Sequence, residues 1–311
     1  LAPLVYFWRG TLGQVVLAPG DGLPYSLPLR LLGMDLLRSG EWPLWNPFVF
    51  SGFPLFGQMQ SALLYPGTWL LLVLSPAAGM NWQMLSLYSS AALGTFLYAR
   101  AIGCQRGASL FAGLTFSLGG FLVAHLAHVA LPQGAACLPW LLWSLERLRT
   151  AARFRFVLAA TLALVLAIVA GHPPTPMVLL LASGLYVAWF GVANVPPVGR
   201  LRFLALSALA VVAALGLTAV QLLPTAELAS QSVRAKLDFE GFISFSLPPS
   251  HLPLLLFPFF FGGSTLSPYW GAWNLPELSG YAGVLPLMLA IATLPALRRS
   301  PLRRPRRRPP P

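Results

Sequence analysis

The sequence predicts an all-α fold, a polytopic bundle of transmembrane helices, on three observations. Only 9% of the 311 residues are charged, whereas 57% are hydrophobic, and the mean hydropathy is +0.71. A soluble domain carries roughly 25% charged residues and needs them for its surface. The apolar residues come in long runs, not in the alternation typical of a membrane β-barrel. These features exclude a soluble enzyme, a disordered protein and a secreted disulfide scaffold.

About eight spans are expected, because a helix needs about 20 apolar residues to cross the hydrocarbon layer. Seven segments reach or approach this length: 81–101, 107–125, 129–145, 154–171, 174–193, 203–223 and 281–297. Residues 1–8 resemble the end of an eighth span, and we expect the chain to be a fragment of a longer protein. The apolar runs 63–74 and 252–262 are shorter and contain prolines. Runs of this kind are expected to lie in the interface or to re-enter the membrane.

Arginine sets the expected orientation. Arginines occupy every second connection between the spans and the tail 298–311, which places these segments in the cytoplasm. The two large loops, 9–80 and 224–280, then lie outside together with seven of the eight acidic residues. The sequence therefore predicts one transmembrane domain, 1–297, and a basic Pro/Arg-rich cytoplasmic tail. After a span, such a tail is more typical of a lipid-facing anchor than of a nucleic-acid-binding arm.

The first outer loop is expected to contain a helix that lies in the membrane surface. Ser26 as N-cap, Pro28 in the first turn and Gly40 past the end bound about three turns. One side of this helix is polar and the other apolar: Arg30, Asp35 and Arg38 against Leu29, Leu32 and Leu36.

Asp21 is the candidate catalytic residue. It lies between Gly20 and Gly22 shortly after the first expected span, so its carboxylate would hang near lipid headgroups at the outer surface. Partial desolvation at such a place favours a carboxylate that accepts protons, as a general base does. The alternative is a turn residue that bonds its own backbone, because Asp-Gly is a common turn signal.

These residues are part of a longer pattern. The order Gly20-Asp21, Pro43-Leu44-Trp45-Asn46-Pro47, Gly52-Phe53-Pro54, Gln60-Ser61 and Tyr65-Pro66 resembles the YfhO family of bacterial membrane proteins. The resemblance continues in order over nearly the whole chain, through Phe121–Leu126, Glu146-Arg147, Gly171-His172-Pro173, Gln221–Pro224, Glu227, Ser246–Pro249, Phe257-Pro258 and Gly280-Tyr281. Its most specific part is the Pro-Leu-Trp-Asn-Pro stretch.

The resemblance implies the architecture of GT-C glycosyltransferases, multi-span enzymes that use polyprenyl-phosphate-linked sugars. It implies that Asp21 acts as general base, or as metal ligand, at the acceptor. Trp45, Asn46, Gln60, Tyr65 and Glu227 would support the acceptor or the loop. No cofactor is certain, and the need for a divalent metal stays open. The expected location is the bacterial cytoplasmic membrane, with the acidic loops outside.

Four further residues are candidates for contact with the phosphate of the donor. His125, His128 and His172 fall at the same outer face, where imidazoles bind phosphate or metal; equally, they could cap helix ends. His125 and His172 are assigned to the donor phosphate. Arg234 is an outer cation suited to a phosphate, although pairing with nearby loop carboxylates is an alternative.

The leading hypothesis is therefore a membrane glycosyltransferase. It would pass a sugar from a polyprenyl-linked donor in the bilayer to an envelope polymer, lipid or protein outside, without a nucleic-acid partner. One alternative is a transporter of lipids or lipid-linked sugars. The few ionisable groups inside the spans weigh against ion-coupled transport. The other alternative is a non-catalytic protein of envelope assembly.

Overall fold

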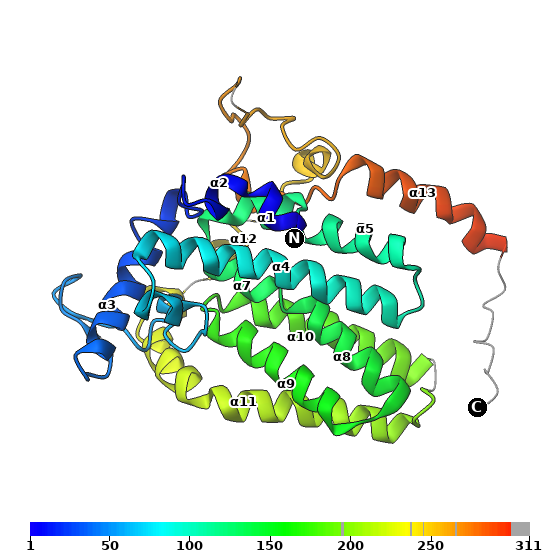
Figure 1. Ribbon diagram of the computed structural model, residues 1–311, viewed down its shortest axis with the longest axis horizontal. Helices are drawn as coiled ribbons and strands as arrows, with labels where there is room; N and C mark the ends of the chain where they lie inside the picture. The colour runs from blue at the N-terminus through cyan, green and yellow to red at the C-terminus, as the bar shows by residue number, and fades with distance from the viewer. Residues whose placement is uncertain (194–195, 237, 245, 265, 300–311) are drawn as a thin grey trace. The chain divides into compact units, whose positions relative to one another are not determined.

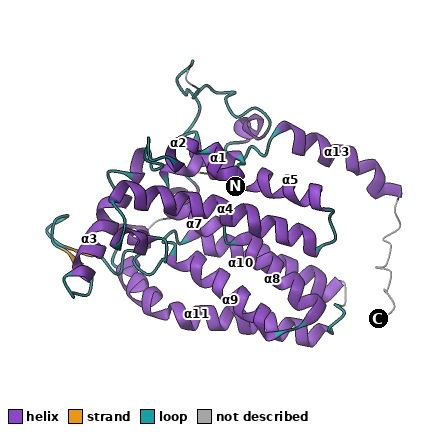
Figure 2. Ribbon diagram, viewed as in Figure 1, coloured by secondary structure: helices purple, strands orange, loops and turns teal. Residues whose placement is uncertain are grey.

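In the computed structural model the chain is predominantly helical (Figure 1, Figure 2), which confirms the all-α class. The structure describes residues 1–193, 196–236, 238–244, 246–264 and 266–299, without the side chains of 192–193, 234, 242 and 295–299. The α-helices are α1 (Ala2–Tyr6), α2 (Trp8–Thr11), α3 (Ser26–Arg38), α4 (Pro76–Ala101), α5 (Arg106–Ser117), α6 (Gly120–Ala124), α7 (Ala130–Ala135), α8 (Leu138–Ala151), α9 (Phe154–Val169), α10 (Pro174–Ala188), α11 (Arg200–Ser230), α12 (Phe239–Ile243) and α13 (Val284–Arg299).

Short helices and one small hairpin fill the connections. The 3-10 helices are η1 (Gly20–Gly22), η2 (Met59–Ser61), η3 (Thr68–Leu72), η4 (His125–Ala127), η6 (Val233–Lys236), η7 (Pro249–Leu255) and η8 (Pro276–Leu278), and a π-helical turn, η5 (Trp189–Ala193), extends α10. Strands β1 (Trp45–Asn46) and β2 (Phe53–Pro54) pair antiparallel, with Trp45 opposite Pro54. All other described segments between these elements are loops and turns.

Within the described residues, three helical segments are long and apolar enough to cross a membrane: Arg106–Ala127, Pro174–Gly191 and Arg200–Ser230. Phe154–Val169 and Val284–Leu294 are shorter apolar helices. These helices support a membrane protein, while the eight spans inferred from the sequence stay a prediction. The segment expected as a span at 129–145 is divided into α7 and α8, and the break at Ala136 and Cys137 precedes Pro139 in the first turn of α8.

The described chain forms two compact units, one of Leu1–Leu118 with Leu122–Ser246 and one of Gly119–Phe121 with the chain from Leu247 onward. In the first unit α4, α8, α9 and α11 lie side by side (Figure 1). Its largest apolar core joins α8, α9, α10 and α11 through side chains such as Leu148, Ala160 and Phe203. In the second unit His251 stacks on Phe261 and accepts the N–H of Ala272 at Nε2 (2.9 Å).

The N-terminal segment and the first loop are anchored to the helices by buried amides. The Asn81 side chain accepts the N–H of Leu17 (2.7 Å) and donates to the carbonyls of Gly10 and Val15. In the same way Gln221 of α11 donates to the carbonyl of Phe56 (2.8 Å). Such bonds satisfy loop backbone groups that would otherwise be buried without partners.

The helix expected in the first loop exists as α3, but two details of the expectation were wrong. Ser26 is the first helical residue, and Tyr25 occupies the N-cap position without a side-chain cap. Arg30 does not belong to an exposed polar side, because its side chain is completely buried, while Asp35 and Arg38 form an exposed pair at 2.6 Å. The difference follows from α4 and α7, whose Gln83 and Gln133 side chains bind Arg30 on a side that helical periodicity alone assigns to the surface.

Candidate functional site

The Gly20–Gly22 turn, which carries Asp21, packs against η4. A Cβ atom on Gly20 would lie 3.2 Å from the Cβ of Ala127, and one on Gly22 would lie 3.6 Å from the Ala127 carbonyl oxygen. This close approach brings the turn next to His125 and His128. The Asp21 carboxylate is exposed, and within the described residues no cation pairs with it.

His125 and His128 lie together, with ring centroids 5.3 Å apart. His125 is buried. The Nδ1 atom of His128 is also buried and has no hydrogen-bond partner among the residues that the structure describes. A buried ring nitrogen without a partner costs free energy, so this turn offers a hydrogen-bonding position to a ligand or to a water molecule.

The His172 turn lies against another part of the first loop. Gly171 has a positive φ of +101°, and a Cβ there would lie 2.2 Å from the carbonyl oxygen of Met59 and 3.1 Å from the Cα of Gln60. His172 contacts Thr175 Oγ1 through Nδ1 at 2.7 Å. The first loop therefore contacts two of the histidine turns, although by different segments, with Asp21 at the first and Gln60 at the second.

Trp45 and Asn46 belong to the β1–β2 hairpin. Asn46 is buried and its Oδ1 accepts the N–H of Phe48 (2.9 Å), which closes the turn. Trp45 is half exposed and covers Gly52, where a Cβ would lie 2.4 Å from the indole ring. Both contacts shape the loop, and nothing in them reaches the histidine turns.

Two candidates lie elsewhere. Glu227 is exposed near the end of α11. Its backbone carbonyl accepts the hydroxyl of Ser230. The side chain of Arg234 lies outside the described part of the structure, and the assignment of this residue to a phosphate stays a prediction.

The strongest electrostatic feature, which sequence reasoning missed, is Arg30. Its Nη1 donates to Gln83 Oε1 (2.6 Å) and its Nη2 donates to Gln133 Oε1 (3.1 Å). The Nε atom is buried without a partner among the described residues. Neither of these acceptors carries a charge. Burial lowers the pKa of Arg30 to about 10, so the guanidinium is still positive at neutral pH.

Tyr65 completes this group. Burial is the main cause that raises the pKa of the Tyr65 phenol, and the nearby Arg30 charge opposes the rise. The phenol therefore stays protonated at physiological pH and is available as a hydrogen-bond donor. Arg30, Gln83, Gln133 and Tyr65 will be called the Arg30 cluster. A buried cation that only neutral groups contact is costly, and a bound anion would offset that cost.

An apolar cavity of about 490 Å³ adjoins the Arg30 cluster. Tyr65 and Gln133 line it, and it extends along α4, α8 and α9 between small and apolar side chains, among them Leu87, Ala136, Trp140, Trp143, Leu162 and Leu166. Arg30 itself does not line the cavity and acts on it from behind Tyr65 and Gln133. The arrangement suits an elongated apolar ligand with a negatively charged end.

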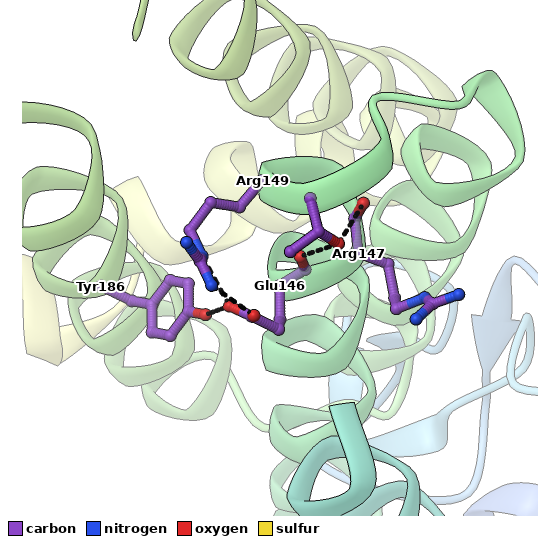
Figure 3. A network of polar contacts seen from close by, with 5 residues as sticks. Glu146, Arg147, Arg149 and Tyr186 are labelled. Carbon is purple, nitrogen blue, oxygen red and sulfur yellow. Dashed lines mark hydrogen bonds and ion pairs between the residues drawn. The ribbon is translucent and has the colours of Figure 1, made fainter. Parts of the chain in front are cut away.

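The one acidic residue expected at the cytoplasmic side has a structural role. Glu146 is buried and binds Arg149 through both carboxylate oxygens (2.6 and 2.8 Å), while the Tyr186 hydroxyl donates to it at 2.5 Å (Figure 3). The sequence placed Glu146 beside Arg147. Figure 3 shows that Arg147 points away from the carboxylate.

One signal for the Arg30 cluster exists in the sequence. Gln83 and Gln133 are polar residues in apolar segments, and such residues need partners. The spacing of apolar residues describes neighbours within one helix. It cannot show that both glutamines contact Arg30, from which they lie 53 and 103 positions away in the sequence.

No metal centre is evident, because no three His, Cys, Asp or Glu side chains of the described chain come together. No family model, curated protein or solved structure matches the chain. The resemblance stated above therefore rests on the quoted residues alone.

Proposed function

We propose that the chain is an integral membrane glycosyltransferase of GT-C-like architecture in a bacterial cytoplasmic membrane. The observation that carries the proposal is the Arg30 cluster beside an apolar cavity of about 490 Å³. A polyprenyl phosphate has the matching chemistry, an isoprenoid chain for the cavity and an anionic phosphate for the polar end. The donor is thus a sugar linked to polyprenyl phosphate, and the acceptor is an envelope polymer, lipid or protein.

Asp21 is the proposed general base. The acceptor hydroxyl oxygen attacks the anomeric carbon of the sugar, and its proton passes to the Asp21 carboxylate. The bond between the anomeric carbon and the phosphate oxygen breaks, and polyprenyl phosphate leaves with the electron pair. Exposure of Asp21 and the absence of a paired cation in the described chain support this role, because a base needs free lone pairs and access to the acceptor.

The histidine turns and the positive potential of Arg30 would stabilise the phosphate that carries the developing charge. His125 and His128 stand next to the Asp21 turn, and the buried Nδ1 of His128 is available for a hydrogen bond. His172 would act from its own turn, which contacts the first loop at Met59 and Gln60. No step of this proposal requires a metal, and the need for one stays open.

The test is the composition of the surface glycan in cells that lack the full-length protein, complemented at matched membrane levels. Wild type and Asp35→Asn should restore a sugar modification, and Asp21→Asn should not. Asp35 is the matched control, because it is also an exposed carboxylate of the first loop and contacts only Arg38 among the described cations. Equal restoration by Asp21→Asn would make Asp21 a turn residue and favour the transporter and assembly alternatives.

A further inference from the structure

A second cavity, of about 480 Å³, lies among α4, α8 and α9 and is lined by three arginines. Arg100 comes from the end of α4, Arg147 from α8 and Arg155 from the start of α9. The remaining lining is aromatic and apolar, with Trp143 and Phe156 prominent. Arg30 and Asp21 have no part in this lining, so this is a separate place in the molecule.

The three guanidinium groups are held in position by groups that do not neutralise them. Arg147 and Arg155 both lie over the ring of Phe156, at 5.3 and 4.8 Å from its centroid. Arg100 donates to the carbonyl oxygen of Cys104 (2.5 Å). The contacts with the Phe156 ring and the Cys104 carbonyl orient the guanidinium groups, but the three positive charges still repel one another.

Among the described residues, no carboxylate forms an ion pair with any of the three arginines. Glu146 is the only acidic residue between Glu41 and Glu227 in the sequence. Its two oxygens are occupied by Arg149 and Tyr186, on the side of α8 away from Arg147 (Figure 3). Arg147 is partly buried, whereas Arg100 and Arg155 are exposed, and three like charges around one cavity favour an anion from outside the chain.

The residues that line the cavity indicate which kind of anion binds there. Guanidinium groups bind phosphate oxygens in bidentate pairs, and the apolar wall next to them accepts hydrocarbon. Trp143 lines both this cavity and the apolar cavity beside the Arg30 cluster, so a hydrocarbon chain can leave the arginines along α8. By the distribution of arginines this end faces the cytoplasm, where basic cavities between helices bind the headgroups of anionic lipids.

We infer that Arg100, Arg147 and Arg155 form a binding site for the phosphate of an anionic phospholipid from the cytoplasmic leaflet. The site rests on the placement of the chain in a bilayer and not on its proposed transferase activity. The bound lipid cross-links α4, α8 and α9 and stabilises the bundle, because its phosphate contacts a side chain of each helix.

The test compares phosphatidylglycerol with phosphatidylcholine of identical acyl chains, bound to the purified full chain and counted by native mass spectrometry. Wild type is expected to retain phosphatidylglycerol in preference, and to unfold at a higher temperature when this lipid is added. Arg147→Gln/Arg155→Gln is expected to lower the preference about tenfold or more, the effect of losing charged hydrogen bonds.

Arg153→Gln is the matched control. Arg153 is exposed at the N-cap of α9, two positions before Arg155. Its backbone carbonyl accepts the N–H of Phe156, and it does not line the cavity. This variant should bind like wild type. The double variant removes mutually repelling charges, so it is expected to fold, which its helical circular dichroism and elution volume check; if it does not fold, the Arg155→Gln single variant takes its place.

Three results would overturn the inference. The first is equal retention of both lipids by wild type, and the second is an unchanged preference in the folded arginine variant. The third is that millimolar inorganic phosphate displaces phosphatidylglycerol and gives the same thermal shift, which would make the site one for a free anion. Loss of glycan transfer in Asp21→Asn with lipid preference intact would separate this site from the proposed function.

Discussion

At the residue scale, Arg30 is expected to lower the stability of the free protein and is proposed to bind the phosphate of the donor. Its guanidinium is fully buried and contacts only neutral acceptors. A residue of this kind is expected to destabilise the free protein and to favour a bound anion. The two effects can be separated, because stability is measured without ligand.

The first prediction is that Arg30→Gln does not lower the free energy of unfolding at pH 7 and raises it by up to about 2 kcal/mol. The pKa of Arg30 in the folded chain, about 10, lies below its usual value. The charge therefore costs stability below about pH 10, and the cost declines as the pH rises through that value. Thermal unfolding of both proteins at pH 7 and pH 10.5 should show the difference shrink. A variant that is strongly destabilised at both pH values would contradict this.

The second prediction concerns Glu146, whose buried carboxylate pairs with Arg149. Glu146→Gln should destabilise the chain by about 2 kcal/mol, because it leaves the Arg149 charge without its partner. The cost is moderate since the Arg149 side chain is still 20% exposed. Thermal unfolding measures it, and Glu146→Gln/Arg149→Gln should lose less than the sum of the two single variants. Additive losses would show that the two side chains do not interact.

How far the sequence predicts the site differs from residue to residue. The Gly-Asp-Gly spacing correctly indicated a turn at Asp21, since glycine tolerates the positive φ of +53° found at Gly20. Arg30 was placed on the polar side of α3, because helical periodicity describes one helix without its neighbours. Arg30 is buried because Gln83 of α4 and Gln133 of α7 contact its guanidinium group.

At the scale of elements, the apolar runs predict the helices well and their ends less well. The run 203–223 became α11, which continues to Ser230 through Pro224. The run 129–145 became two helices. Hydropathy averages over a window and is insensitive to one proline, whereas Pro139 in the first turn of α8 has no N–H to donate to the carbonyl of Ala135, the last residue of α7.

The third prediction tests the contact between the His172 turn and the first loop. Gly171→Ala places a Cβ 2.2 Å from the Met59 carbonyl oxygen at a positive φ. It should displace the turn, lower stability by about 2 kcal/mol or more, and lower glycan transfer. The matched control is Gly199→Ala, which has a similar φ of +88° and no atom of the described residues within 4 Å of the new Cβ. The control should lower the free energy of unfolding by only about 1 kcal/mol. Equal destabilisation of the two variants in thermal unfolding would mean that the contact between Gly171 and Met59 is unimportant.

At the scale of the whole molecule, the distribution of charge sets the expected topology. The segment from 100 to 202 holds many arginines and one acid, while the first loop holds three acids. Three helices of the described part of the chain have the length and composition to cross a membrane.

The fourth prediction is therefore that position 39 faces outward and Cys104 faces the cytoplasm. Ser39 is exposed after α3, and Cys104 follows α4 as a free thiol. In intact spheroplasts a membrane-impermeant maleimide should label Ser39→Cys in a background without the native cysteines. Cys104 should be labelled only after permeabilisation. The opposite pattern would reverse the topology, and labelling of both in intact cells would place them on one side.

The Arg30 cluster and its apolar cavity are expected to bind a polyprenyl phosphate. The most direct test is native mass spectrometry of the full chain with polyprenyl phosphate and with polyprenol of the same length. Wild type should prefer the phosphate, Arg30→Gln should lose that preference by about tenfold, and Leu162→Trp, which fills the cavity, should weaken binding of both. Equal binding of the two lipids by wild type, or a preference that survives Arg30→Gln, would show that the Arg30 cluster does not select the phosphate.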